Sequence, residues 1–199
     1  MLYEMKMREA FQLPQDELVE LKYSPWGENT APQCLFQGCF VQNRGFFFDF
    51  IAYEKDPLAR FKKSGDPVYK DSCLELFCNF APQKSDLYIN FEMNANGAGL
   101  ICVGNGRENR VPLKTTLLPT IRAAKTDNFW DVILYVPQEI IREVYGEKID
   151  FSEGYEMRAN VYKCGDETDH PHWLTWSPIK SEKPDFHRPE QFGVFKLVK

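Results

Sequence analysis

The sequence predicts an all-β fold with one short helix. Several runs of β-branched, aromatic and alternating apolar residues are separated by clusters of Gly, Pro, Asn and Asp, which is typical of strands. Aromatic residues make up 15% of the chain, and strands favour aromatic side chains. Only one segment carries good helix signals. The expected strands are 35–42, 46–53, 72–80, 87–94, 99–103, 129–136, 155–163 and 192–198.

Two of these strands form the clearest pair. The runs at 72–80 and 87–94 alternate strictly between apolar and other residues, and the few residues between them suit an antiparallel hairpin. The run at 155–163 repeats the alternation. The helix is expected at 137–146, where Pro137 is suited to the first turn and Gly146 to the end.

Length and charge limit the class of protein. A chain of 199 residues can bury one substantial core, so we expect a single domain over residues 1–199. The net charge of −5 is spread along the chain without a Lys/Arg cluster, so we expect neither nucleic acid nor a membrane as a partner.

The six cysteines form no C-x-x-C pair, and we expect free thiols in a reducing compartment. Residues 1–11 show no apolar stretch of secretory length. The sequence as it stands is therefore expected to be cytoplasmic, and a secreted protein would require that a leader had been removed.

Alternation places polar side chains on one face of three strands, because successive side chains point to opposite faces of a sheet. These residues include Asp71, Glu75, Glu92, Asn94, Arg158 and Asn160. Carboxylates accept hydrogen bonds from paired hydroxyls, and Arg and Asn donate to hydroxyl oxygens. The pattern thus suits a sugar site, although a solvated outer face would show the same alternation.

Aromatic rings complete the predicted site, because a sugar ring has an apolar C–H face that stacks on Tyr or Trp. Tyr69 is the first candidate, since it lies next to the polar face in sequence. Trp173 and Trp176 follow, and Trp26 ranks behind them. Each ring could instead be a buried lid over the core.

Other chemistry has weaker signals. Glu75 and Glu92 could form the acid pair of a glycoside hydrolase, but we assign no catalytic residue. The segment 164–172 holds metal-ligand types without a regular zinc spacing, and its acids could supply oxygens to a structural calcium ion. We expect no other metal and no cofactor. The segment 186–193 could fix the last strand through hydrogen bonds or contact a ligand.

The order of several segments resembles the family-nine carbohydrate-binding-module-like proteins, which are relatives of the DOMON β-sandwiches. The likeness runs from about residue 25 to the end, and the segments that carry it are 70–77, 88–97, 157–165, 176–179 and 184–193. It implies a two-sheet antiparallel β-sandwich that binds sugar chain ends between two aromatic rings, as in modules attached to xylanases. The resemblance also implies a role in polysaccharide catabolism.

The resemblance also implies roles for particular residues. Tyr69 corresponds to one ring of the clamp, although the family's binders carry Trp there. Glu75 corresponds to an acidic contact, and Glu92 stands where the binders carry a basic residue. The second ring would be Trp173 or Trp176. Related sandwiches hold haem through Met with His or Lys, so a haem-binding or interaction domain is a further alternative.

Overall fold

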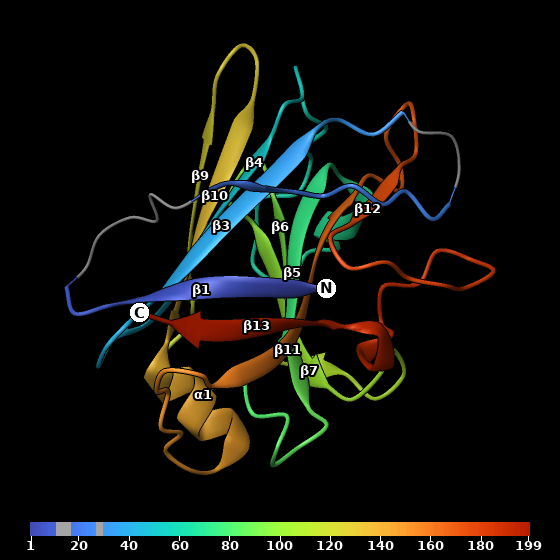
Figure 1. Ribbon diagram of the computed structural model, residues 1–199. Coiled ribbons are helices and arrows are strands. Elements are labelled where there is room, and N and C mark those ends of the chain that lie inside the picture. Colours follow the sequence, from blue (N-terminus) through green and yellow to red (C-terminus); the bar gives the residue numbers. More distant parts are fainter. Residues whose placement is uncertain (11–16, 27–29) are drawn as a thin grey trace.

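The computed structural model describes residues 1–10, 17–26 and 30–199 (Figure 1). Its regular structure is mostly β, as predicted, with one α-helix in the described residues, α1 (Gln138–Tyr145). That helix follows Pro137 and ends at Gly146, whose φ of 75° is left-handed, as the sequence indicated. The strands are β1 (Leu2–Arg8), β2 (Val19–Glu20), β3 (Cys34–Val41), β4 (Gly45–Ala52), β5 (Cys73–Asn79), β6 (Tyr88–Asn94), β7 (Gly99–Gly104), β8 (Val111–Pro112), β9 (Thr120–Lys125), β10 (Trp130–Pro137), β11 (Glu156–Cys164), β12 (Trp173–Thr175) and β13 (Gly193–Val198).

Hydrogen bonds join the strands into one curled sheet in the order β8-β7-β6-β5-β11-β13-β1-β3-β4-β10-β9. Strand β1 lies between β13 and β3 and is parallel to both, so it connects the two arms of the sheet (Figure 1). The two-sheet division that we predicted is therefore not confirmed, and the sheet is not wholly antiparallel. β12 and β2 pair with β11 and β3 outside the main path.

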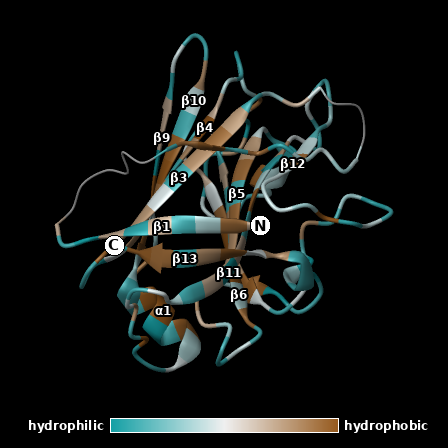
Figure 2. Cartoon of the chain, viewed as in Figure 1, coloured by the Kyte–Doolittle hydropathy of each residue, from teal (hydrophilic) through white to brown (hydrophobic). Residues whose placement is uncertain are grey.

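Both arms bury their apolar faces in one main core. Phe36 and Phe48 come from one arm, Leu76 and Phe91 from the other, and all four are fully buried in the same cluster. Figure 2 shows the hydrophobic colour concentrated on the strands, whereas the peripheral loops are mostly hydrophilic. Sequestering these side chains from water is the main stabilising term of such a fold.

The opposite face of β5, β6 and β11 is buried as well. A second cluster covers it, and Phe77, Tyr88 and Tyr162 from the strands pack there against Phe186 and Phe192 from the C-terminal segment. Phe186 stacks on Tyr162 with ring centroids 4.1 Å apart. The polar row that we derived from alternation is therefore enclosed, and the solvated-face alternative is wrong for Glu75, Glu92, Asn94 and Asn160.

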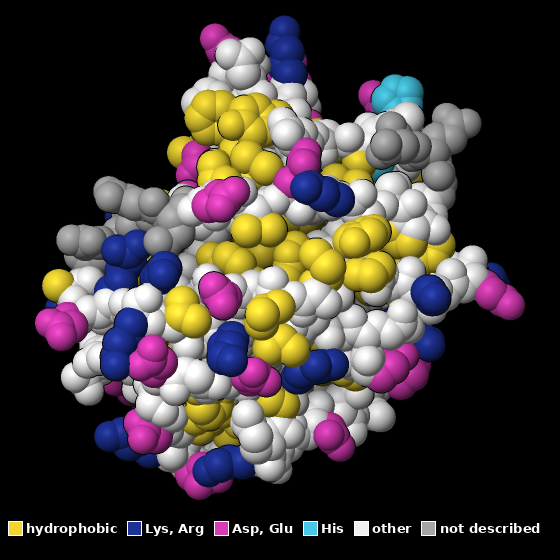
Figure 3. Space-filling view, in the orientation of Figure 1, with side chains coloured by type: hydrophobic (Ala, Val, Ile, Leu, Met, Phe, Trp, Pro, Cys, Tyr) yellow, Lys and Arg dark blue, Asp and Glu magenta, His cyan; other side chains and the backbone are white. Residues whose placement is uncertain are grey.

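The surface carries charges of both signs. Figure 3 shows hydrophobic side chains gathered across the middle of one face, with acidic and basic side chains interspersed around them. No helix in the described part of the chain has the length and apolar character needed to cross a membrane.

Candidate functional site

Strand register brings the candidate residues together. Glu75 on β5 lies directly opposite Glu92 on β6 and Tyr162 on β11. In the next row, Cys73 lies opposite Cys164, which in turn lies opposite Trp173. Directly opposite residues of an antiparallel pair point to the same face, so these rows form one continuous surface.

A pocket of about 220 Å³ lies over these rows. The strands supply its floor through Glu75, Phe77, Glu92 and Cys164. The short 3₁₀ turn before β5 supplies Tyr69, and β12 supplies Trp173. Loops supply the rest of the lining, namely Arg107, Arg110, Asp166, Pro184, Asp185, Phe186 and His187. A larger hollow of about 590 Å³ near residues 7–9 and 148–153 holds none of the predicted site residues.

Two half-buried aromatic rings belong to the pocket wall. Tyr69 sits in the short 3₁₀ turn before β5, and Trp173 begins β12. Trp173 Nε1 donates to Asp166 Oδ1 at 2.8 Å, which fixes the indole in place. The Asp166 backbone N–H donates to the Tyr69 carbonyl at 3.4 Å, so one loop ties the two rings together.

The floor carries two buried carboxyl groups. Burial, and then the nearby charge of Glu92, raise the pKa of Glu75 well above its usual range. Burial raises the pKa of Glu92 to about 7, against the lowering effect of Arg110 and Arg107. Glu92 Oε1 accepts from Asn90 Nδ2 at 2.9 Å and from Arg110 at 3.4 Å. The pair therefore holds protons near neutral pH and can both donate and accept.

Cationic and neutral nitrogen groups complete the polar lining. Arg107 donates to Asp185 at 2.8 Å, and Arg110 reaches Glu92. A hydrogen bond of 2.7 Å joins the Tyr88 hydroxyl to His187 Nδ1. Burial, Arg110 and Arg107 together lower the pKa of His187 to about 3, so its imidazole is neutral. Each of these side chains is oriented by a protein partner before any ligand arrives.

Four of the predicted site residues line this pocket: Tyr69, Glu75, Glu92 and Trp173. Of the two tryptophans left open by the sequence, the structure brings Trp173 to the pocket. Trp176 is 2% exposed and packs in the main core against Tyr3 and Phe195. Its assignment as a ring platform is therefore wrong, because residues three apart on an extended segment face opposite sides.

Asp71 and Asn94 are joined in a hydrogen-bonded knot away from the pocket. Asp71 accepts from the backbone N–H groups of Arg60 and Phe61 at 2.8 and 3.0 Å and from Arg60 Nε at 3.0 Å. Asn94 Nδ2 donates to Asp71 Oδ2 at 2.9 Å. Both side chains thus fix the segment before η1 (Val68–Lys70) rather than face the cavity.

Asn160 and Arg158 also lie outside the pocket lining. Asn160 is fully buried, donates to the Ser177 carbonyl and accepts from the Ser177 N–H, which anchors the chain after β12. Arg158 lies four residues along β11 from Tyr162, about 13 Å at the rise of a strand.

Sequence reasoning missed Arg107, Arg110, Asp166 and Asp185. These residues lie on connections between strands, where period-two alternation gives no orientation. His187 was within the segment 186–193 whose role was left open; the structure shows its hydrogen bond to β11, and ligand contact stays a prediction. Its Phe186 carbonyl accepts from the Tyr162 hydroxyl at 3.1 Å, and Phe186 and His187 line the pocket.

The structure also bears on the residues that the metal and haem alternatives would use. Glu167 forms ion pairs with Arg60 and Lys70, and Asp166 holds Trp173, so these acids of the 164–172 segment already have partners. Met93 is the methionine that the haem alternative would use, and it is fully buried among the apolar side chains of the main core, which gives that alternative no support. Among the described residues, Cys73, Glu75 and Cys164 gather three metal-ligating atoms within 4.8 Å of one another.

Comparison with known proteins shows similarity to carbohydrate-binding proteins. Residues 9–197 match the family described as carbohydrate-binding family 9. A candidate carbohydrate-binding protein from Bacteroides uniformis has a similar crystal structure, with a TM-score of 0.82, 24% identity and 99% of each chain covered. A search of curated proteins gave no match.

Two structures of a family 9 carbohydrate-binding module from Caldicellulosiruptor kristjanssonii are also similar in fold. The complex with cellotriose has a TM-score of 0.67 at 9% identity, covering 99% of this chain and 93% of that one. The complex with glucose has a TM-score of 0.66 at 9% identity, covering 100% and 96%.

Proposed function

The chain belongs to carbohydrate-binding family 9, and from this premise we propose that it binds a saccharide, without covalent chemistry, in the pocket lined by Tyr69 and Trp173. One observation carries the proposal: a single small cavity is lined both by two half-buried aromatic rings and by buried carboxyl groups that can hydrogen-bond to sugar hydroxyls. A pyranose needs both, because its C–H face is apolar and its rim carries hydroxyls.

The electrostatics of the lining support a neutral, hydroxyl-rich ligand. Glu75 and Glu92 have raised pKa values, so they can donate as well as accept hydrogen bonds. Arg107 and Arg110 add fixed donors. Because these groups are already oriented by partners such as Asp185, a sugar meets a site with little side-chain entropy left to lose.

The volume supports recognition of one sugar ring at a time. About 220 Å³ is below the range of about 300–1,000 Å³ that drug-sized ligands occupy, so a single ring at a chain end fits best. We infer a β-linked glucan or xylan end as the ligand, and a role in polysaccharide catabolism. Cellotriose and glucose in the two structures of the Caldicellulosiruptor module support this choice.

Hydrolysis is a weaker interpretation of the same residues. A retaining glycosidase needs one ionised carboxylate as nucleophile beside one protonated acid. Burial raises the pKa of both Glu75 and Glu92, so near neutral pH Glu75 is protonated and Glu92 is only partly ionised, which leaves no fully ionised nucleophile on the pocket floor. This favours binding over cleavage.

Calorimetric titration with glucose, cellotriose, xylotriose and a non-sugar polyol tests the proposal. We expect at least one saccharide to bind, and we expect Tyr69→Ala and Trp173→Ala each to weaken it at least tenfold. Tyr53→Ala is the matched control, because Tyr53 is 47% exposed and does not line this pocket.

Two results would contradict the proposal. One is the absence of binding to every saccharide by wild-type protein with a cooperative unfolding transition. The other is unchanged affinity in both ring variants. Release of reducing sugar during a long incubation with the bound saccharide, lost in Glu75→Gln, would support the hydrolase instead.

A further inference from the structure

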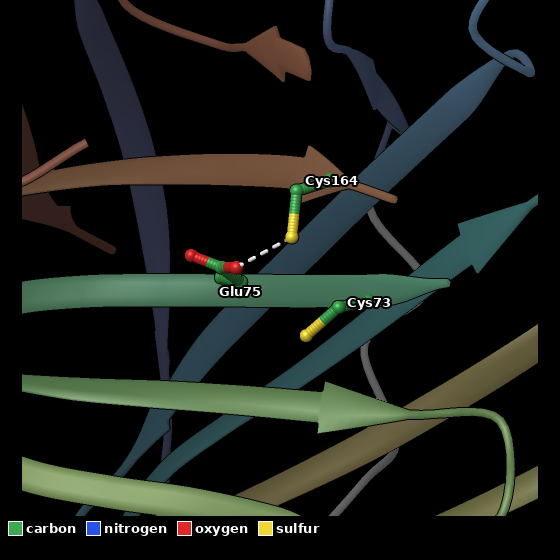
Figure 4. Close-up of side chains that lie close together, drawn as sticks. All are labelled: Cys73, Glu75 and Cys164. Carbon is green, nitrogen blue, oxygen red and sulfur yellow. Dashed lines mark hydrogen bonds between the residues drawn. The ribbon is translucent and has the colours of Figure 1, made fainter. Parts of the chain in front are cut away.

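Three buried groups with metal-ligating atoms meet beneath the pocket. Cys73 and Cys164 are directly opposite each other on β5 and β11, and Glu75 lies two residues along β5 on the same face. The two Sγ atoms and a carboxyl oxygen all lie within 4.8 Å of one another. Figure 4 shows the Cys164 thiol facing the Glu75 carboxyl, with Cys73 beside them on the same strand as Glu75.

The protein gives these groups weak partners. Glu75 is 2% exposed, and Cys164 Sγ donates to its Oε1 at 2.9 Å. A thiol is a poor donor, and a buried carboxyl group normally has stronger partners. Within the described residues, no Lys, Arg or His forms an ion pair with Glu75. Cys73 Sγ lies 3.8 Å from the Leu74 carbonyl, a marginal contact.

Two sulfur ligands and one carboxylate favour a particular class of ion. Thiolates bind Zn²⁺ and similar thiophilic ions, whereas Ca²⁺ and Mg²⁺ require oxygen ligands. In a tetrahedral zinc site the sulfurs would lie about 3.8 Å apart and each sulfur about 3.5 Å from the oxygen, given the usual bond lengths. The present 2.9 Å between Cys164 Sγ and Glu75 Oε1 would have to widen by about 0.6 Å, which a side-chain rotation supplies.

The surroundings leave one coordination position open. Glu75 and Cys164 both line the pocket, so a water molecule can reach an ion held between them, whereas Cys73 is fully buried and does not line the pocket. Binding breaks two S–H bonds and the O–H bond of the protonated carboxyl group, and three protons go to solvent as one divalent cation takes their place. The site then carries one net negative charge, near the guanidinium of Arg110.

We propose that Cys73, Glu75 and Cys164 form a binding site for a thiophilic divalent cation of the zinc type at the floor of the pocket. The site is distinct from the structural calcium site that the acids of segment 164–172 could form. It does not depend on whether the pocket also takes a sugar.

Cobalt titration of the full-length, reduced and chelator-treated protein tests the site without any sugar. We expect one equivalent of Co²⁺ to give thiolate-to-cobalt charge-transfer absorption and the visible bands of tetrahedral cobalt, and Zn²⁺ to abolish both. We expect Cys73→Ala and Cys164→Ala to lose at least tenfold in cobalt affinity and Glu75→Gln to weaken it by a smaller factor. Cys78→Ala is the matched control, because Cys78 is a buried thiol on the same strand that faces the main core.

A second measurement needs no variant. We expect Zn²⁺ to slow alkylation of Cys73 and Cys164 in wild-type protein, measured by peptide mass spectrometry, while alkylation of Cys102 is unchanged. Cobalt bands that survive in both cysteine variants, or that are absent from folded wild-type protein, would overturn the proposal. Equal protection of every cysteine would overturn it too, since that result indicates global stabilisation.

Discussion

The raised pKa of Glu92 makes the stability of this protein depend on pH in a predictable direction. Its pKa rises from 4.5 to about 7, mainly because the carboxyl group is buried. Folded protein therefore binds this proton more tightly than unfolded protein does, so the contribution of Glu92 is fully present below about pH 4.5 and is lost as the pH rises through 7. At about 1.4 kcal/mol for each pKa unit, the loss amounts to between about 3 and 4 kcal/mol.

The substitution Glu92→Gln isolates this effect, because Gln keeps the shape and the hydrogen bond to Asn90 but does not titrate. Urea unfolding of both proteins across the range from acid to mildly alkaline pH gives the difference in free energy. We expect wild type to lose stability relative to Glu92→Gln as the pH rises through 7. His172 and His187 have pKa values lowered to about 4 and about 3, so their contribution to stability changes with pH in the opposite direction. Subtracting one free-energy curve from the other removes this contribution, because both proteins contain the two histidines.

Because Glu75 and Glu92 interact, the experiment needs a control for Glu75. The charge of Glu92 raises the pKa of Glu75, so the two carboxyl groups titrate as a pair. The double variant Glu75→Gln/Glu92→Gln is therefore needed to separate the contribution of Glu92 from that of Glu75. Free-energy curves for wild type and Glu92→Gln that stay parallel from pH 5 to pH 8 would refute the reasoning. Such a result would mean that water or an ion reaches the carboxyl group and removes the burial penalty.

Three further predictions concern packing and buried charge. Trp176→Ala should lose about 3–5 kcal/mol of unfolding free energy in urea, whereas Trp173→Ala should lose much less; equal losses would place both rings in the core. Gly193→Ala should lose about 1–3 kcal/mol in the same assay, since the new Cβ would lie 2.5 Å from the Trp176 ring, and a neutral result would show that this ring can move. Lys163→Met should lose about 3–5 kcal/mol in thermal or urea unfolding, because Lys163 is fully buried 3.7 Å from the Glu54 carboxylate; a more stable variant would show that its desolvation outweighs the ion pair.

Local pattern was sufficient to predict most strands but not all. The strands at 34–41 and 88–94 were found because apolar and aromatic residues dominate one face. β1 was missed, although Tyr3 and Met5 are buried, because charged residues alternate with them and the pairing partner is β13 at the far end of the chain. β9 was missed because every residue in it is exposed or half-buried at the sheet edge.

For the site as well, the sequence predicted local features but not contacts with distant segments. Alternation placed Glu75 and Glu92 on one face because the period of a strand is fixed by backbone geometry. It could not show that this face is enclosed, since the enclosing side chains, such as Phe186, come from a loop about a hundred residues away. Asp71 and Asn94 share the polar pattern but stabilise a turn, which sequence alone cannot distinguish from a ligand contact.

The sugar site and the metal site share Glu75, and the pH dependence of binding distinguishes the two ligands. A divalent cation at Cys73, Glu75 and Cys164 must displace their protons, so its apparent affinity rises with pH. A neutral sugar displaces none, and ionisation of Glu92 near pH 7 replaces a hydrogen-bond donor in the pocket with an acceptor. Opposite pH dependences, or a sugar affinity that is indifferent to pH while cobalt binding tightens, would therefore assign the two ligands to different chemistry within one cavity. Parallel dependences would leave the two ligands unseparated, because a sugar that prefers the ionised Glu92 carboxylate also binds more tightly as the pH rises.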